Sequence, residues 1–581
     1  MTDEQTQQAP RLEHLGAPSV HVFRDGDVEV TISLREWGEP QRSPCSDYDD
    51  LIWTRGVGFS LESSSLDEDR LIKTLTQSPS APLSASLTGH YGLIHVRRSA
   101  QGQLCVALHS DRLRSFPLFY AIRGARLLVS DDALWLSERL EAELHPLSEV
   151  SMWRTAQLVS GHDTLWRGIR QLRASERVCW EHGVLSAVDG ELFVHDEDDE
   201  LSASEVKTQL RDAARQYTAR LIAFANGAQI VVPLSGGFDS RLVLTALVEA
   251  KYPKLLAFTY GKERKGEAEI SERLAQQLGV PWCFVRYTQE KWSAWAMSED
   301  AAELERRARS AGVLLHVQDP VAIKELVERG DIEQDSVLVY GHSGDVHAGS
   351  VIDEKSMKAS LSAAGYVDLL ARKYFRFQAD TAPPHSRERA STLDVMLRAK
   401  LARELSEPFR ARAADGVTRE ALIDELERWF WRERCSKYLV HSMRTHEMYG
   451  LRWWFPLWDE AFTSVWMRVP LKHRGRVGVY HEHVDEYFTE VAGVAPPRAV
   501  VRASSPRPTP WYKRLLLRSR LVQVLRLRSR HPFGWYALIP IWRHFTSAHP
   551  EEHLNVHLVD RELRWWRSER STRSSQGEGS H

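Results

Sequence analysis

Six residues near the middle of the chain, at positions 235–240, combine residue types that could hold a phosphate group. They read Ser-Gly-Gly-Phe-Asp-Ser and follow a short apolar run. The apolar run predicts a buried strand, and the helix formers after Ser240 predict a helix. Gly236 and Gly237 let backbone N–H groups crowd around an anion at the helix N-terminus. Asp239 adds a carboxylate of the kind that binds Mg²⁺.

The spacing of this loop separates it from the Walker A loop, because no Gly-Lys-Ser or Gly-Lys-Thr follows the glycines. It resembles the S-G-G-x-D-S pyrophosphate loop of enzymes that split ATP into AMP and pyrophosphate, and all the fixed positions match. The alternative interpretation is a glycine-rich strand-to-helix turn without a ligand. The strand–loop–helix setting favours the nucleotide site.

The composition is that of an ordinary globular protein and excludes several classes of function. The chain has 581 residues, of which 43% are hydrophobic and 27% charged, and its net charge is −3. This length predicts about two to four domains, and the charge gives no case for nucleic-acid binding. Five scattered cysteines without a C-x-x-C pair argue against a disulfide framework, a zinc site and a persulfide-relay thiolase. Residues 1–10 are polar and no apolar run approaches about 18 residues, so we expect a cytoplasmic protein without a signal peptide or membrane span.

The pattern of elements changes near residue 200. The first part predicts short strands at residues 20–23, 28–34, 91–96, 104–108, 118–122 and 127–129. The second part predicts helices at 203–226 and 267–278 that alternate with strands at 229–234, 255–260, 282–287 and 336–340, followed by mostly helical chain from about residue 378. Such alternation indicates a parallel sheet wound with helices, which binds ligands at the carboxyl ends of its strands. Ser235, Thr259 and Gly341 all fall at such ends.

These patterns divide the chain into five expected parts. Residues 1–195 form a β-rich domain, and the acidic run at 196–201 is a solvated linker. Residues 202–500 form the parallel-sheet domain, 501–570 a basic helical extension and 571–581 a disordered tail.

With the loop and this order of elements in view, the chain resembles the glutamine-hydrolysing asparagine synthetase superfamily. Relatives of the same kind are the β-lactam synthetases, the lasso-peptide cyclases and, through Trp458 in P-L-W-D, synthetase-like proteins of surface-polysaccharide gene clusters. The matching segments lie at residues 89–92, 111–112, 117–120, 130, 161–169, 267–279, 341–345, 452–459 and 470. The resemblance implies an α/β and α+β architecture: an N-terminal β-rich, glutaminase-like (Ntn-type) sandwich, then a doubly wound parallel-sheet pyrophosphate-loop domain with a helical C-terminal part.

The resemblance also implies a site for ATP and Mg²⁺. The residues that would cradle the nucleotide phosphates are Ser235, Gly236, Gly237, Asp239 and Ser240, with Gly341 and Gly344 from the G-H-S-G-D segment. Asp239 and Asp345 would hold Mg²⁺, while Thr259 and Tyr260 would lie near the adenine edge. Lys513, or else Arg502, would replace the family's late lysine at the α-phosphate, although a surface role suits either residue equally well.

Three departures from the family pattern change the expected chemistry. The glutaminase nucleophile is a cysteine at the second position, but here the residue is Thr2, which opens a polar segment. We therefore expect a degenerate glutaminase-like domain that has lost glutamine hydrolysis. Val346 stands where the family places a glutamate, so His342 or His347 would be the candidate base, or else a loop histidine without a catalytic role. The third departure is the missing late lysine itself.

A basic segment near the C-terminus suggests a further partner. Residues 503–531 carry arginines and lysine without an acidic residue, interleaved with leucines and valines. This pattern is typical of a basic amphipathic helix, which binds anionic membrane surfaces or polyanionic substrates. The alternative is a packing helix with a solvated arginine face.

The leading hypothesis is an ATP-dependent, AMP-forming amide ligase. It would adenylate the carboxylate of a small molecule, peptide or glycan and transfer it to an amine or to ammonia. The alternative within the enzymes is an asparagine synthase that makes asparagine from aspartate. An alternative of another class is a non-catalytic pseudo-synthetase that uses the fold to bind a partner.

Overall fold

The computed structural model describes a large share of the chain, and the statements below concern those residues. They are residues 16–42, 50–67, 69–78, 80–99, 101–145, 156, 158–181, 183–190, 193–314, 317–342, 344, 346, 349, 351–352, 362–375, 387–413, 417–474, 478–497, 521–522, 524–525, 538–539 and 561. Most of the basic segment at 503–531 and all of 571–581 lie outside them.

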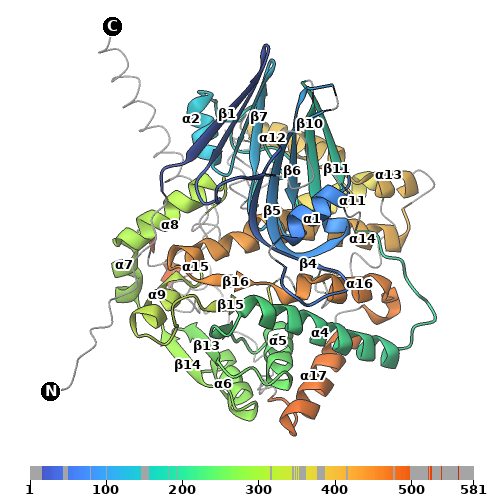
Figure 1. Ribbon diagram of the computed structural model, residues 1–581. Coiled ribbons are helices and arrows are strands. Elements are labelled where there is room, and N and C mark those ends of the chain that lie inside the picture. The colour runs from blue at the N-terminus through green and yellow to red at the C-terminus, as the bar shows by residue number, and fades with distance from the viewer. Residues whose placement is uncertain are drawn as a thin grey trace, which may run out of the picture.

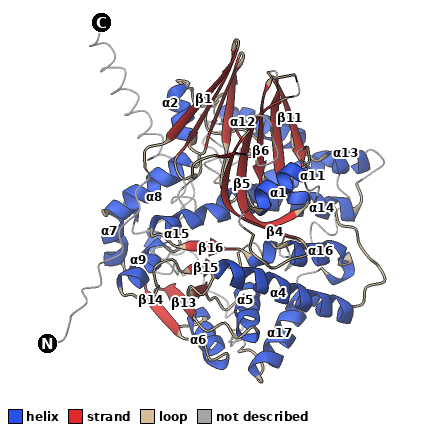
Figure 2. Cartoon of the chain, viewed as in Figure 1, coloured by secondary structure: helices blue, strands red, loops and turns tan. Residues whose placement is uncertain are grey.

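The N-terminal part is a sandwich of two sheets (Figures 1 and 2). One sheet has the order β1 (Ser19–Asp25), β2 (Val28–Leu34), β8 (Arg126–Ser130), β7 (Phe119–Arg123) and β9 (Ile169–Gln171). The other has the order β11 (Val184–Asp189), β10 (Glu176–Glu181), β6 (Leu104–Ser110), β5 (Leu87–Arg98), β4 (Leu51–Ser60) and β3 (Gln41–Arg42). Inward-facing side chains such as Ile32, Ile94 and Val129 pack between them in one buried cluster. Alternate residues of each strand face this cluster, because strand side chains point to opposite faces in turn.

A third sheet, in which all strands are parallel, carries the loop at residues 235–240. Its order is β14 (Trp282–Arg286), β13 (Leu255–Gly261), β12 (Ile230–Pro233), β15 (Val337–Val339) and β16 (Arg452–Trp454), and every neighbouring pair is parallel. Helices α4 (Ala203–Ala225), α5 (Phe238–Glu249), α6 (Glu267–Gln277) and α17 (Val479–Ala492) share a buried cluster with Ile230 and Val232. Helices α7 (Gln289–Ala296), α8 (Glu299–Ser310) and α9 (Pro320–Glu328) share another with Val231. The two faces of the sheet are therefore both covered by helices, which confirms the doubly wound architecture.

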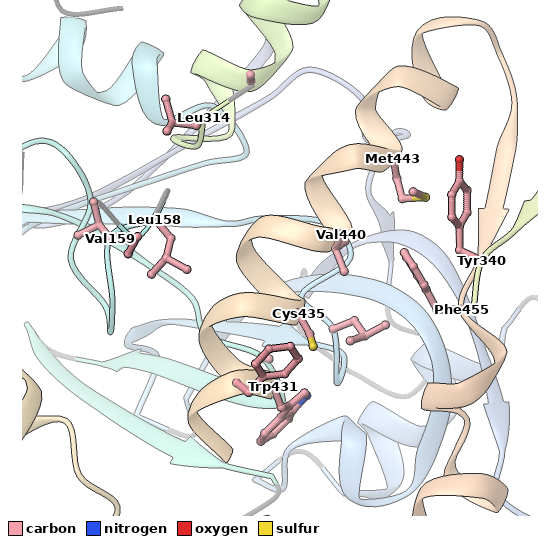
Figure 3. Close-up of a cluster of buried hydrophobic side chains, with 14 of the residues drawn as sticks. Leu158, Val159, Leu314, Tyr340, Trp431, Cys435, Val440, Met443 and Phe455 are labelled. Atoms are coloured by element: carbon pink, nitrogen blue, oxygen red, sulfur yellow. The ribbon is translucent and has the colours of Figure 1, made fainter. Parts of the chain in front are cut away.

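The helical C-terminal part lies partly between the sandwich and the parallel sheet and partly beside the sandwich (Figure 1). It comprises α11 (Ala363–Tyr374), α12 (Arg387–Arg403), α13 (Glu407–Ala413), α14 (Arg419–Trp429), η4 (Phe430–Leu439), η5 (Val440–Met443), α15 (Arg444–Met448), η6 (Pro456–Trp458), α16 (Glu460–Arg468) and η7 (Leu471–His473). The η4 segment is a π-helix of 10 residues, although π-helices are rare and usually confined to one turn. Figure 3 shows Trp431, Cys435, Val440 and Met443 along this continuous helical stretch.

The acidic run between the two sheet regions is held against the protein. The amide N–H groups of Asp196 and Asp198 donate to the carbonyls of Met467 and Arg468, both at 3.0 Å. Glu197 lies 2.5 Å from the buried guanidinium of Arg474. The run therefore follows the end of α16 as a fixed connection rather than as freely solvated chain. Among the described residues, no helix is both long and apolar enough to cross a membrane.

Candidate functional site

The loop between β12 and α5 is closed by its own hydroxyl groups. The backbone N–H of Ser235 donates to Ser240 Oγ at 3.1 Å, and the two serine Oγ atoms are also 3.1 Å apart. The backbone N–H of Gly237 donates to Ser235 Oγ at 3.1 Å. Residues 235–239 are half-buried, whereas Ser240 is buried. The loop thus lies at the carboxyl end of the central strand. Its turn is partly open to solvent, and the buried hydroxyl of Ser240 holds it in place by hydrogen bonds to Ser235.

Helix α5 begins immediately after the glycines. Gly237 is its N-cap residue in extended conformation, and Asp239 lies in the first turn. An N-terminus of this kind favours negative charge, because the first backbone N–H groups have no partner within the helix. The arrangement is the one that the sequence predicts for an anion-binding loop.

The segment with Gly341 and Gly344 lies directly against this helix N-terminus. A methyl group added at Gly341 would lie 2.6 Å from the backbone nitrogen of Ser240. One added at Gly344 would lie 2.4 Å from Cγ of Asp239. Such distances are far below van der Waals contact. At Gly341 the nearest atoms are backbone, so glycine is needed for this close approach, whereas at Gly344 they belong to the Asp239 side chain, which a larger residue would displace. Two motifs about a hundred residues apart in the sequence therefore meet at Asp239.

Thr259 and Tyr260, at the end of β13, have structural contacts. Thr259 Oγ1 donates to the Leu234 carbonyl at 2.7 Å and accepts a hydrogen bond from Trp282 Nε1 at 3.0 Å. Tyr260 stacks on Tyr287 with ring centroids 5.1 Å apart, and burial raises its pKa well above the usual value for tyrosine. Thr259 thus ties the neighbouring strand to the start of the loop. The predicted contact of both residues with adenine stays a prediction.

Several predicted site residues lie outside the described part of the chain. These are Asp345, Lys513, Arg502, His347 and Thr2. Of the two predicted Mg²⁺ ligands only Asp239 is described, and the described residues contain no group of three or more potential metal ligands. Asp239 nevertheless fits Mg²⁺, since this ion is commonly held by one or two carboxylates, substrate phosphates and water. The backbone of Gly344, next to the second predicted ligand, lies against the Asp239 carboxylate.

Helix α17 supplies contacts to the loop that no local pattern indicated. The hydroxyl of Tyr480 donates to Asp239 Oδ1 at 2.6 Å. The ring of His481 stacks on Phe238 at 4.0 Å between centroids, and Arg241 forms an ion pair with Asp485. Tyr480 is 241 positions away from Asp239 in the sequence. A tyrosine from the late part of the chain therefore contacts the predicted metal ligand, whereas Lys513 and Arg502 lie outside the described residues.

A buried polar cluster continues from the end of β15. The hydroxyl of Tyr340 lies 2.6 Å from Asp319 Oδ2 and 2.7 Å from His446 Nε2. Burial raises the pKa of Asp319 to about 6 and lowers that of His446 to about 3. Burial also lowers the pKa of His342 to about 4, so His342 is neutral at pH 7 and has a free electron pair for a proton. This protonation state is the one that a base requires, and the role of His342 as a base stays a prediction.

In the N-terminal sandwich, by contrast, Asp111 and His90 form buried structural contacts. Both belong to segments that resemble the family. Asp111 accepts backbone N–H groups from Tyr91 at 2.7 Å and from Leu113 at 2.6 Å. His90 is buried, lies 3.0 Å from Ser115 Oγ, and accepts the backbone N–H of Phe455 at 3.1 Å. Its pKa is lowered to about 3 by burial, which keeps the ring neutral for that bond.

Comparison with known proteins gives one family match in the region of the loop. Residues 229–316 match the family described as "Queuosine biosynthesis protein QueC". The matched region runs from β12 through α8, so it includes the loop at 235–240 and ends before β15. No curated protein matches the chain.

Two of the solved structures that match the chain are NAD synthetases, and their similarity to it is low. The NH3-dependent NAD synthetase from Campylobacter jejuni is 14% identical, with 36% of this chain and 96% of that chain covered, at a TM-score of 0.19. The glutamine-dependent NAD+ synthetase from Acinetobacter baumannii, in complex with ADP, is 12% identical, with 62% and 81% covered, at a TM-score of 0.17. These scores are too low to carry an argument about this chain. The similarity that bears on the site is the family match, because residues 229–316 contain the loop at 235–240.

Proposed function

We propose that the chain is an ATP-dependent, AMP-forming ligase of the asparagine synthetase type that joins a carboxylate to an amine or to ammonia. The observation that carries the proposal is the meeting of two glycine motifs at Asp239, where Gly341 lies too close to the backbone for any side chain and Gly344 lies against the Asp239 side chain. Close backbone approach of this kind is what a loop around a pyrophosphate group requires. The family match of residues 229–316, which contain the loop at 235–240, supports the same site.

Each loop residue has a role in this proposal. The backbone at Ser235, Gly236 and Gly237 would surround the pyrophosphate, with Ser240 fixing the shape of the turn through its hydroxyl group. The N-terminus of α5 would stabilise the negative charge that grows on the leaving pyrophosphate. Bound Mg²⁺, held by Asp239 together with Asp345, would supply positive charge to the same oxygens.

The proposed chemistry makes a poor electrophile reactive. A free carboxylate resists attack by an amine because of its charge, and transfer of AMP converts it to a mixed anhydride with a good leaving group. The amine nitrogen then forms a bond to the acyl carbon, the bond to AMP breaks and the amine loses a proton. Neutral His342, at the edge of the sheet beside Gly341, is our candidate acceptor for that proton.

We further propose that residues 1–195 are a degenerate glutaminase domain and that residues 202–500 form the synthetase domain. Two observations support the first part: Thr2 replaces the nucleophilic cysteine, and His90 and Asp111 are engaged in buried contacts. Nitrogen would then come from free ammonia or from an amine-bearing acceptor.

The test is pyrophosphate release by the full chain with ATP, Mg²⁺ and a panel of carboxylates that includes aspartate. Release should need ATP, Mg²⁺ and the cognate acid but not glutamine, and product should form with an added amine or with ammonium at alkaline pH. Release with aspartate and ammonium alone would identify an asparagine synthase. Glutamate formed one-to-one with amide would contradict the loss of the glutaminase, and failure to bind ATP with Mg²⁺ would contradict the ligase itself.

A further inference from the structure

A cavity of about 550 Å³ lies between the N-terminal sandwich and the C-terminal helices, away from the loop at 235–240. One side comes from residues 161–163, from the segment that contains Arg170 and Arg173, and from the end of β11. The other side comes from α12, the start of α13, and the helical stretch that contains Arg428 and Arg432. None of its lining residues belongs to the predicted ATP site. Its volume is within the range of sites for small molecules.

The lining of this cavity is strongly charged, with positive groups in excess. Six arginines and one lysine line it, against four carboxylates, whereas the chain as a whole carries a net charge of −3. The inner cations are already paired: Lys400 with Asp163, Arg428 with Glu425, and both Arg173 and Arg432 with Asp189. Arg173 also pairs with Glu176 at 2.8 Å, so Asp189 is shared by two guanidinium groups, of which Arg173 alone has a second carboxylate partner in the described part of the chain.

The buried guanidinium of Arg432 retains unused hydrogen-bonding capacity. Its side chain is only 3% exposed, and its Nε has no hydrogen-bond partner among the described residues. Burial lowers the pKa of Arg432, and the neighbouring charge of Arg173 lowers it further. Asp189 pairs with the terminal nitrogens of Arg432, but a buried Nε–H without an acceptor is costly unless a further acceptor binds it.

The rim adds two cations without a carboxylate partner. Arg403 and Arg410 are exposed, line the cavity, and form no ion pair with the described residues. The carboxylate of Glu407, also on the rim, has no described cationic partner either, so the balance of unpaired charge stays positive. Guanidinium groups suit carboxylate and phosphate oxygens because their N–H groups form a planar fork.

We propose that this cavity is a second ligand site, which binds a small polyanion with at least two carboxylate or phosphate groups. Arg432 would contact one anionic group in the interior while Arg403 and Arg410 hold another at the rim. Because the site is built from both the sandwich and the C-terminal helices, its ligand would also hold these two regions together. The proposal is independent of the ligase activity.

The experiment is titration calorimetry of the full-length protein with citrate and, separately, with inorganic tripolyphosphate. We expect binding of at least one probe, and we expect the double variant Arg403→Gln/Arg410→Gln to bind it about tenfold or more weakly. The double variant should fold normally, because both side chains are exposed and form no ion pair with the described residues. Arg372→Gln is the matched control: Arg372 is exposed on α11, does not line the cavity, and should leave the affinity unchanged.

The two probes separate the two classes of ligand. Binding of citrate alone would assign the site to carboxylates, binding of tripolyphosphate alone to phosphates, and binding of both to polyanions in general. The proposal is overturned if neither probe binds, if the double variant binds as tightly as the wild type, or if Asp239→Ala removes the binding instead. The last result would place the probe at the loop. Each of these outcomes can be interpreted even if the protein does not turn over ATP, because the experiment measures binding.

Discussion

The loop at 235–240 and the motif residues of the N-terminal sandwich both resemble parts of one enzyme family, but they differ in exposure and in their hydrogen-bond partners. In the loop, Ser235, Gly236 and Asp239 are half-buried and lie at an open sheet edge. In the sandwich, His90 and Asp111 are 6% and 1% exposed, and backbone groups of the protein occupy their polar atoms. The two sets of residues that resemble the family therefore differ in their surroundings. The loop residues lie where a ligand has access to them, whereas His90 and Asp111 stabilise the fold.

This contrast predicts that substitutions in the two regions damage different properties. A substitution in the loop should change activity and leave stability nearly unchanged, whereas one in the sandwich motifs should do the reverse. The four predictions that follow test this difference, beginning with the largest effect.

Asp239→Ala should abolish pyrophosphate release, with a loss of at least about 100-fold, because it removes the carboxylate at the phosphate-binding turn. The free energy of unfolding should fall by no more than about 2 kcal/mol, because one hydrogen bond to a charged group is lost. Pyrophosphate assays and urea unfolding measure the two quantities on the same protein. Full pyrophosphate release by this variant would remove Asp239 from the site.

Asp111→Ala should have the opposite signature. It leaves the buried N–H groups of Tyr91 and Leu113 without their acceptor, at a cost of about 3 kcal/mol or more in the free energy of unfolding. Urea unfolding should show this loss, while the folded fraction keeps its activity. Glu62→Ala, at an exposed position of the same region, is the control and should change stability by less than about 0.5 kcal/mol. Unchanged stability of Asp111→Ala would mean that this motif is not structural.

Tyr480→Phe should have an intermediate effect on activity. It removes the hydroxyl that donates to Asp239 at 2.6 Å, so the carboxylate loses orientation and turnover should fall by about tenfold. The matched control is Tyr487→Phe on the same helix, whose hydroxyl donates to Glu249 at 2.7 Å. Steady-state rates of pyrophosphate release should separate the two variants. Equal rates for both would show that the contact with Asp239 has no part in turnover.

Thr2→Ala should have no effect on activity. No glutaminase chemistry is assigned to residue 2, so product formation from an amine or from ammonium should equal that of the wild type. The measurement is amide product with and without glutamine. A large loss of glutamine-dependent product would show that Thr2 is a working N-terminal nucleophile. The N-terminal domain would then be catalytic as well.

Local sequence patterns predicted those parts of the fold that local physics determines. The alternation in residues 28–34 predicted β2 with its observed bounds, and the apolar run before Ser235 predicted the central strand of the parallel sheet. The resemblance predicts Gly341 and Gly344 as site residues, and that role stays a prediction, while the structure shows that both lie close to Asp239 at the start of α5.

What the sequence could not predict depends on contacts between distant residues. Tyr480 meets Asp239 only because α17 packs against α5, and no spacing in the sequence indicates that packing. The charged cavity likewise combines residues 161–189 with residues 400–432. The sequence did not predict the strand β4 either, because its polar and glycine residues interrupt the apolar pattern. This strand is stabilised by pairing with β5 along its whole length.

The bond between His90 and the Phe455 amide has a consequence during synthesis of the chain on the ribosome. The two residues are 365 positions apart, so His90 leaves the ribosome long before its partner exists. At about 5–20 residues per second, that interval is roughly 20–70 s. Throughout it, the newly made sandwich presents to the cell a surface that the finished protein keeps covered. We therefore expect the N-terminal sandwich to need protection from aggregation during this interval, and slower translation of the region between the two residues should lower the yield of folded protein.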